Sequence, residues 1–190
     1  GDIITVERTQ GEEITVSCDV DGVPTDKSNI VYKCADKFFQ YAGITENKGV
    51  HIHIEKHTPF GAGMGGGSAD GAAVLVALNK LFGTDYHEKV LCRIGVKVGA
   101  DIPFCIVGGT ALCLDTGAIV APLNDIEGYY IVVVKPDIHI STKEAYSLVN
   151  PQYPQNPLAD IIKMPVEEWK GLMKNDFEKS VFAKYPSVMN

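Results

Sequence analysis

A cluster of glycines is the part of this sequence best suited to chemistry. Five glycines occupy the seven positions 61–67, here called the glycine loop, directly before an Ala-, Leu- and Val-rich helical pattern. Because glycine has no Cβ, such a loop lets backbone N–H groups approach an anion closely. The helix that follows adds free N–H groups and the positive end of its dipole at the same place. The segment therefore predicts a phosphate-binding loop.

The glycine spacing alone does not specify the phosphate compound. Gly61, Gly63 and Gly66 match the weak G-x-G-x-x-G pattern, and no Lys follows the last glycine as a Walker A loop requires. A second helical pattern follows, where a nicotinamide or flavin site would need a strand ending in an acid. The alternative is a glycine-rich turn without a ligand. The entropic cost of ordering glycine, roughly 0.5–1 kcal/mol each, argues against it.

Two polar residues at the start of this helical pattern could assist phosphate binding. The Ser68 hydroxyl could reach a phosphate or Mg²⁺, or it could be the helix N-cap, and the two roles can coexist. Asp70 is interpreted as a first-turn acid that suits the helix dipole, in preference to a metal ligand.

Asp101 is the carboxylate with the strongest functional signal. It lies between Ala100 and the apolar run Ile102-Pro103-Phe104, where a buried charge needs a partner or a purpose. It could be a general base or a cap of the next turn, and the residues alone leave both open.

Four polar residues alternate along one predicted strand. His51, His53, Glu55 and His57 would share one face, and that spacing could hold Zn²⁺. Since Ile52 and Ile54 occupy the opposite face, a solvent-facing polar side is the simpler interpretation.

Local patterns predict the elements that position these residues. Two alternating segments, 3–7 and 14–20, flank Gln10-Gly11 and predict a hairpin. Asn29 suits the N-cap of a helix that ends at Gly43. The further predicted strands are 50–56, 110–114, 119–122 and 129–134. The further predicted helices run from Ser68 or Asp70 to Gly83 and over 86–98, 142–149, 166–173 and 176–185.

The order of these elements predicts the fold class. Strands and helices do not alternate strictly, which favours an α+β fold. The Pro-rich segment 151–157 predicts a linker and a domain boundary.

Composition narrows the classes of function. The 190 residues carry a net charge of −7 and no basic stripe, which argues against nucleic acid as a partner. No apolar run is long enough to span a membrane, and no signal-peptide pattern opens the chain. The five cysteines never form a C-x-x-C spacing and predict reduced thiols. We expect a cytoplasmic enzyme without a membrane partner, as a monomer or weak homodimer.

Four segments together resemble a known family. They are 59–81 with GGGSADGAAVLVALNKL, 28–31 with SNIV, 99–104 with GADIPF, and 136–142 with PDIHIST. The first is similar to the ATP loop of the GHMP kinases, which include galactokinase, homoserine kinase and mevalonate kinase. In this order the four segments most resemble the 4-diphosphocytidyl-2-C-methyl-D-erythritol kinases of that superfamily. The resemblance covers essentially the whole chain.

The resemblance implies a fold and an activity. The fold would be the two-domain GHMP-kinase fold, with a ribosomal protein S5 domain 2-like N-terminal domain over 1–150 and the start of an α/β C-terminal domain over 151–190. The activity would be transfer of a phosphoryl group from ATP, with Mg²⁺, to the 2-hydroxyl of 4-diphosphocytidyl-2-C-methyl-D-erythritol in the non-mevalonate isoprenoid route. The alternatives are another GHMP kinase, for homoserine or mevalonate, and a phosphate-binding fragment without catalysis.

The resemblance also implies residue roles. Asp101 would take the proton from the substrate hydroxyl, and Asn29 would contribute to the cleft near nucleotide or substrate. Thr142 and Tyr146 would lie beside the cytidine group, where Tyr146 offers an aromatic face, unless it is an ordinary residue of an amphipathic helix. Ser68 would be the Mg²⁺ ligand. The residues expected to bind ATP are Pro59, Gly61, Gly63, Met64, Gly65, Gly66, Gly67, Ser68 and Ala69.

The same comparison predicts that the chain is a fragment. The family's early strand with a Lys, its Asp-Gly-Tyr-His motif and its third Gly/Ser-rich loop do not occur in this sequence. We therefore expect the 190 residues alone to be inactive.

Overall fold

A computed structural model describes all residues except 139, 148, 151 and 190. The chain forms two compact units, Gly1–Glu127 and Gly128–Asn190, and each is described by itself. The family domain boundary expected at residue 150 concerns the complete two-domain fold and stays a prediction.

Three strands form the sheet of the first unit. They are β1 (Ile3–Arg8), β2 (Ile14–Cys18) and β3 (Val50–Glu55), in the order β1-β3-β2. β3 is antiparallel to β1 and parallel to β2, so the predicted hairpin of the first two strands is wrong. The reason lies in β3, whose Val50, Ile52 and Ile54 side chains are at most 1% exposed and fill the centre of the sheet.

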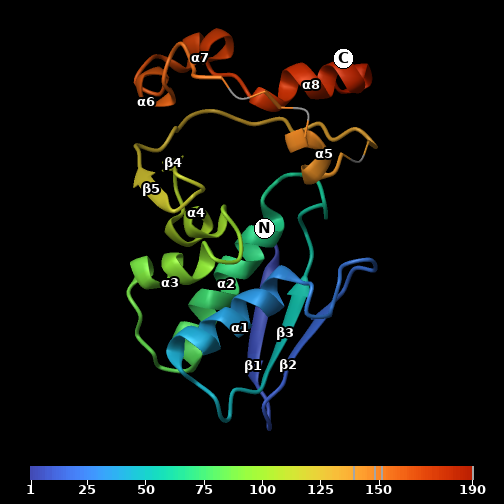
Figure 1. Cartoon of the computed structure of the whole chain (residues 1–190), viewed down its shortest axis with the longest axis vertical. Helices are drawn as coiled ribbons and strands as arrows, with labels where there is room; N and C mark the ends of the chain where they lie inside the picture. Colours follow the sequence, from blue (N-terminus) through green and yellow to red (C-terminus); the bar gives the residue numbers. More distant parts are fainter. Residues whose placement is uncertain (139, 148, 151, 190) are drawn as a thin grey trace. The chain divides into compact units, whose positions relative to one another are not determined.

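Two helices, α1 (Ile30–Ala42) and α2 (Gly66–Leu81), pack against each other and against this sheet (Figure 1). α1 provides the crossover that a parallel β2–β3 pair requires. The predicted caps of α1 are confirmed: the Asn29 side chain accepts the Val31 N–H, and Gly43 is left-handed with φ 66°. The apolar faces of both helices and of β3 form the core.

α2 begins earlier than predicted. Its N-cap is Gly65, in a left-handed conformation with φ 72°, so Ser68 and Asp70 lie inside the helix. The prediction that one of them opens the helix is wrong, because a left-handed glycine can end the loop without a side-chain cap. At the other end Gly83, with φ 61°, follows the C-cap Phe82.

Two shorter helices and a hairpin complete the first unit. α3 (Glu88–Gly95) is shorter than the predicted helix 86–98: it starts after its N-cap His87 and ends at its C-cap Val96. α4 (Ile102–Val107), which the sequence patterns did not predict, starts directly after Asp101. The strands predicted at 110–114 and 119–122 are confirmed as β4 (Ala111–Leu114) and β5 (Ile119–Pro122), which form an antiparallel pair.

The second unit contains short helices. They are α5 (Thr142–Ser147), α6 (Leu158–Ile161), α7 (Val166–Leu172) and α8 (Asp176–Lys184), followed by a 3₁₀ turn, Pro186–Val188. The predicted helices 166–173 and 176–185 are confirmed to within one residue. The helix predicted over 142–149 is confirmed over 142–147, and residue 148 lies outside the described residues. Pro151 of the predicted linker also lies outside them, and 152–157 are irregular.

The strand predicted at 129–134 is wrong for this structure. These six apolar residues are described as irregular chain, and their exposed fractions range from 56% to 100%. An apolar run becomes a strand only where another strand pairs with it, and no strand of the described residues does so here.

Candidate active site

The glycine loop lies in the connection from the end of β3 to α2 and includes the first two residues of that helix. Gly61, Gly63 and Gly65 all have positive φ, from 71° to 72°, which explains why glycine is needed at alternate positions. A Cβ placed on Gly63 or Gly65 would meet no atom within 4 Å, so open space faces both residues. The first N–H groups of α2 have no intrahelical acceptor and lie at this opening. The loop therefore leaves open space beside the backbone donors at the start of α2.

Ser68 is the third residue of α2 and is half-buried. Because Gly65 occupies the N-cap position, the interpretation of Ser68 as the cap is wrong. Ser68 therefore lies in the first turn of α2.

Ile30, the first residue of α1, brings three of the sequence motifs together. Cβ atoms placed on Gly67, Gly71 and Gly99 would lie 3.6, 3.7 and 3.5 Å from its side-chain atoms. The cap of α1, the first turns of α2 and the turn before Asp101 thus converge on one apolar side chain. The structure therefore brings the glycine loop and the GADIPF segment to one place in the first unit.

Asp101 occupies the N-cap position of α4, but its side chain makes no capping hydrogen bond there. The capping alternative is therefore wrong. The carboxylate is also exposed, so the expectation that it is buried among apolar residues is wrong too. Its charge reaches the first unit's interior: burial raises the pKa of the Cys105 thiol, and the charges of Asp101 and Asp70 raise it further. α4, which starts directly after Asp101, packs against α2, and its Ile102 lies 3.4 Å from a Cβ placed on Gly71.

A buried ion-pair cluster lies beneath the glycine loop. Lys56 follows β3, and its ammonium contacts Asp2 and lies 3.0 Å from Asp70 Oδ2 on α2. These three side chains, here called the Lys56 cluster, are only 2–6% exposed. The other oxygen of Asp2 accepts the N–H groups of His57 and Thr58 at 2.7 and 2.6 Å.

The environment shifts the pKa values of the cluster in different directions. Burial opposes ionisation of Asp2, but the hydrogen bonds from Lys56, Thr58 and His57 outweigh it and hold its pKa below the usual range. Burial raises the pKa of Asp70 despite the hydrogen bond from Lys56, and the charge of Asp2 adds to the rise. Burial also works against the charge of Lys56, yet its two carboxylate partners raise its pKa.

Asn29 is 7% exposed and is engaged within its own segment. Its Oδ1 accepts the Val31 N–H at 2.9 Å, and its Nδ2 donates to the Pro24 carbonyl at 2.5 Å. Capping is thus its observed role, and a contribution to ligand binding stays a prediction.

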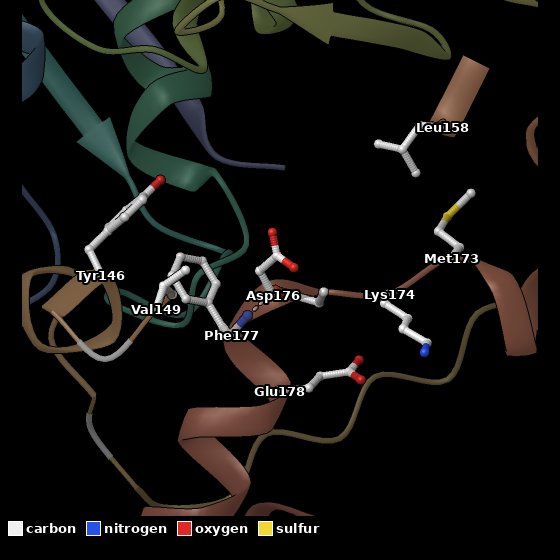
Figure 2. A pocket seen from close by; sticks show the side chains of 9 residues that line it. Tyr146, Val149, Leu158, Met173, Lys174, Asp176, Phe177 and Glu178 are labelled. Carbon is white, nitrogen blue, oxygen red and sulfur yellow. Dashed lines mark hydrogen bonds between the residues drawn. The ribbon is translucent and has the colours of Figure 1, made fainter. Parts of the chain in front are cut away.

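Tyr146 lines a hollow of about 720 Å³ in the second unit. Figure 2 shows Tyr146 and Phe177 on one side of the hollow and Leu158 and Met173 on the other. The rings of Tyr146 and Phe177 meet edge to face with centroids 5.0 Å apart, and Tyr146 is 66% exposed. An aromatic face is therefore available there. Thr142 begins the same helix, α5, and His139 of the PDIHIST segment lies outside the described residues.

The alternating histidines lie on the sheet face opposite the core. The hydroxyl of Ser17 contacts His51 Nε2 at 2.9 Å and His53 Nδ1 at 2.8 Å. Among the described residues, no group of three or more His, Cys, Asp and Glu is placed to hold a metal ion. Nor does any helix within the described parts of the chain have the length and apolarity to cross a membrane.

Comparison with known proteins agrees with this arrangement. Residues 29–109 match the family described as the GHMP kinases N-terminal domain. Over 146 residues the chain is 47% identical to the 4-diphosphocytidyl-2-C-methyl-D-erythritol kinase of Clostridium perfringens, covering 77% of this chain and 50% of that one. It is 41% identical over 171 residues to the enzyme of the same name from Parabacteroides distasonis, covering 88% and 62%. The chain belongs to the GHMP kinase superfamily.

Solved structures support the same fold. A crystal structure of 4-(cytidine 5'-diphospho)-2C-methyl-D-erythritol kinase aligns with a TM-score of 0.70 and 26% identity, covering 99% of this GHMP kinase chain and 66% of the other. Homoserine kinase from Cytophaga hutchinsonii aligns with a TM-score of 0.65 and 22% identity, covering 82% and 53%, which shows the fold alone. The predicted α+β GHMP-kinase fold is confirmed. The chain spans about half the length of the curated relatives it matches.

The Lys56 cluster is the part of this GHMP kinase site that sequence reasoning missed. Asp70 was interpreted as a first-turn acid for the helix dipole, but it is the buried partner of a lysine 14 positions earlier. Asp2 is 54 positions from Lys56, so no local pattern joins them. The available signal was a lysine directly after a buried strand and an acid on the apolar side of a helix.

Proposed function

We propose that the protein transfers the γ-phosphoryl group of ATP to the 2-hydroxyl of 4-diphosphocytidyl-2-C-methyl-D-erythritol. The observation that carries the proposal is the 47% identity to a kinase of that name over the segment that contains the glycine loop and Asp101. The open, left-handed glycines before α2 support it, because they suit the phosphates of a nucleotide. The reaction belongs to non-mevalonate isoprenoid synthesis, and we place the protein in the cytoplasm.

Phosphate binding is assigned to residues 59–69. N–H groups of the glycine loop and of the first turn of α2 would stabilise charge on the phosphates without reorganising during the reaction. A hydroxyl oxygen at Ser68 fits a hard cation such as Mg²⁺, which is held by few protein ligands together with phosphates and water. Bound Mg²⁺ would neutralise charge on the phosphates.

Proton removal is assigned to Asp101. Its carboxylate is exposed and makes no capping bond, and the next residue, Ile102, lies 3.4 Å from a Cβ placed on Gly71 of α2. A carboxylate at that place can accept the hydroxyl proton as the new P–O bond forms. Asn29 would help to shape the same region by holding the start of α1.

Recognition of the cytidine group is assigned to α5 in the second unit. The Tyr146 ring supplies a face for stacking, which is worth about 1–3 kcal/mol per base. Thr142 begins the same helix and would lie beside the group. The division into an ATP-binding domain over 1–150 and a second domain from 151 is part of this proposal.

A substrate panel tests the function. Purified protein carrying this chain is incubated with ATP and, in turn, the diphosphocytidyl compound, homoserine and mevalonate. We expect phosphorylation of the first compound at a kcat/KM well above the others. Preference for homoserine would redirect the proposal to the branch represented by the Cytophaga hutchinsonii structure, and ATP binding without transfer to any compound would leave only the phosphate-binding role.

A further inference from the structure

The Lys56 cluster has no part in the chemistry proposed above, yet it buries three charged groups. Its side chains are 2–6% exposed. Replacing a buried ion-pair group with apolar residues of similar volume is often neutral or stabilising, so stability alone does not explain this cluster. Its position beneath the glycine loop suggests another role.

One side of the cluster holds the start of the connection from β3 to α2. Asp2 uses Oδ1 to accept the N–H groups of His57 and Thr58, and it uses Oδ2 to contact Lys56. The backbone that leaves β3 is therefore fixed by two charge-assisted hydrogen bonds.

The other side of the cluster holds the end of that connection. Asp70 lies on α2 one turn after Gly66 and accepts a hydrogen bond from Lys56 at 3.0 Å. Gly66 itself packs on the start of the connection, because a Cβ placed there would lie 3.2 Å from Thr58 Cγ2 and 3.4 Å from Asp2 Oδ2. Both ends of the connection thus meet at one lysine.

We propose that Lys56 is a positioning residue for the glycine loop. It ties Asp2, at the start of the connection from β3 to α2, to Asp70, at the end of that connection. The N–H groups of the loop thereby stay in the arrangement that binds a nucleotide triphosphate. Glycine-rich backbone has more conformational freedom than any other backbone. When the Lys56 cluster fixes both ends of the connection, the loop loses less conformational entropy on binding the nucleotide. The inference rests on the proposed function, since it assigns a role within ATP binding.

Asp70→Leu is the variant that tests the tie most directly. It removes the link to α2 while Lys56 keeps Asp2 as its partner, so no charge is left unpaired. ATP binding in the presence of Mg²⁺ is measured by calorimetry on the folded protein. We expect the Kd for ATP to rise between about tenfold and 100-fold, because the loop donors lose their alignment. Amide hydrogen exchange in ligand-free protein should become faster over 57–66 and stay unchanged in α1.

Leu78→Ala is the matched control. Leu78 lies near the other end of α2 and is fully buried, so its truncation lowers the unfolding temperature without touching the loop. Its Kd for ATP should stay within about twofold of the unsubstituted protein, the scale of an uncoupled site. An equal rise in Kd in both variants would mean that any loss of stability weakens binding, and it would overturn the positioning role.

The outcomes separate this inference from the function beneath it. If the unsubstituted protein does not bind ATP, the proposed function fails. If it binds ATP and Asp70→Leu binds equally well, the positioning role is overturned while the function stands. Should Asp70→Leu not fold, Asp70→Ala, which also removes the acceptor of the Lys56 hydrogen bond, is measured in its place, and an unchanged Kd there overturns the proposal in the same way.

Discussion

The two candidate binding regions of this molecule are built from different parts of the chain. In the first unit the glycine loop offers backbone N–H groups, and its conformation depends on left-handed glycines and on a buried ion-pair cluster. In the second unit the hollow beside Tyr146 offers side chains on short helices. A site made of backbone should tolerate almost no substitution, whereas a site made of side chains should lose only what the altered side chain contributed.

The largest effect is expected at Asp101. Asp101→Asn removes the proposed base and leaves the shape of the turn, so kcat should fall by about 10²–10⁴-fold. The KM for ATP should change little, because the glycine loop is untouched. Steady-state kinetics with the diphosphocytidyl substrate measure both constants.

Asp85→Asn is the matched control for that variant. Asp85 is exposed and has φ 49°, a conformation that Asn tolerates. Its kcat should stay unchanged. If kcat falls less than about tenfold in Asp101→Asn, Asp101 is not the general base. Phosphoryl transfer would then depend only on the positioning of the reacting groups.

The second prediction concerns the backbone site. Gly65→Ala places a methyl group in the open space before α2, and blocking one N–H bond to a charged phosphate costs about 1.5–3 kcal/mol. The Kd for ATP should therefore rise by at least about tenfold. Gly43→Ala is the control, since Gly43 has a similar left-handed conformation at the end of α1 and equally open surroundings. Both variants should lose a similar amount of stability, and only Gly65→Ala should lose affinity.

The third prediction concerns the side-chain site. Tyr146→Ala should raise the KM for the diphosphocytidyl substrate by a factor that corresponds to about 1–3 kcal/mol of lost stacking, and should leave the KM for ATP unchanged. Tyr146→Phe keeps the aromatic face and should stay near the unsubstituted value. Equal losses for both substrates would indicate a folding defect and would remove the distinction between the two regions.

Local signals predicted the elements of both units well. Asn29 and Gly43 are the caps of α1, as predicted. The glycine-rich segment forms a loop with left-handed glycines before α2. Each of these features depends on a few neighbouring residues, and for that reason it can be predicted from a single sequence. The same reasoning located α5, α7 and α8 of the second unit to within a residue or two, and it missed the short α6.

Features that depend on distant partners could not be predicted. β1 and β2 were paired with each other because a turn joins them, although the apolar side chains of β3 place it between them. Residues 129–134 were predicted as a strand from their apolarity, without knowledge of a pairing strand. The ion pairs of Lys56 join residues up to 54 positions apart and leave no local pattern.

The smallest effect is expected in the pH dependence of stability. The pKa of Asp2 in the folded protein lies below the value of 3.8 expected for an unfolded chain, because Lys56 and two backbone N–H groups outweigh the effect of burial. A carboxyl with a lowered pKa stabilises the folded state above pH 3.8, and this contribution disappears as the pH falls toward the folded pKa. Asp70, whose pKa burial raises, acts with the opposite sign.

Asp2→Asn isolates that contribution. At pH 7 the variant should be less stable by about 1–3 kcal/mol, the range for hydrogen bonds to a charged group. The difference between the two proteins, measured by urea unfolding at a series of pH values, should shrink as the pH falls below 3.8. Carboxyls distant from Asp2 titrate alike in both proteins and cancel in this difference, whereas Asp70, whose pKa the charge of Asp2 raises, contributes to it. If the stability difference between the two proteins stays constant down to about pH 2, Asp2 acts through its shape alone. Its charge would then have no part in holding the start of the connection from β3 to α2.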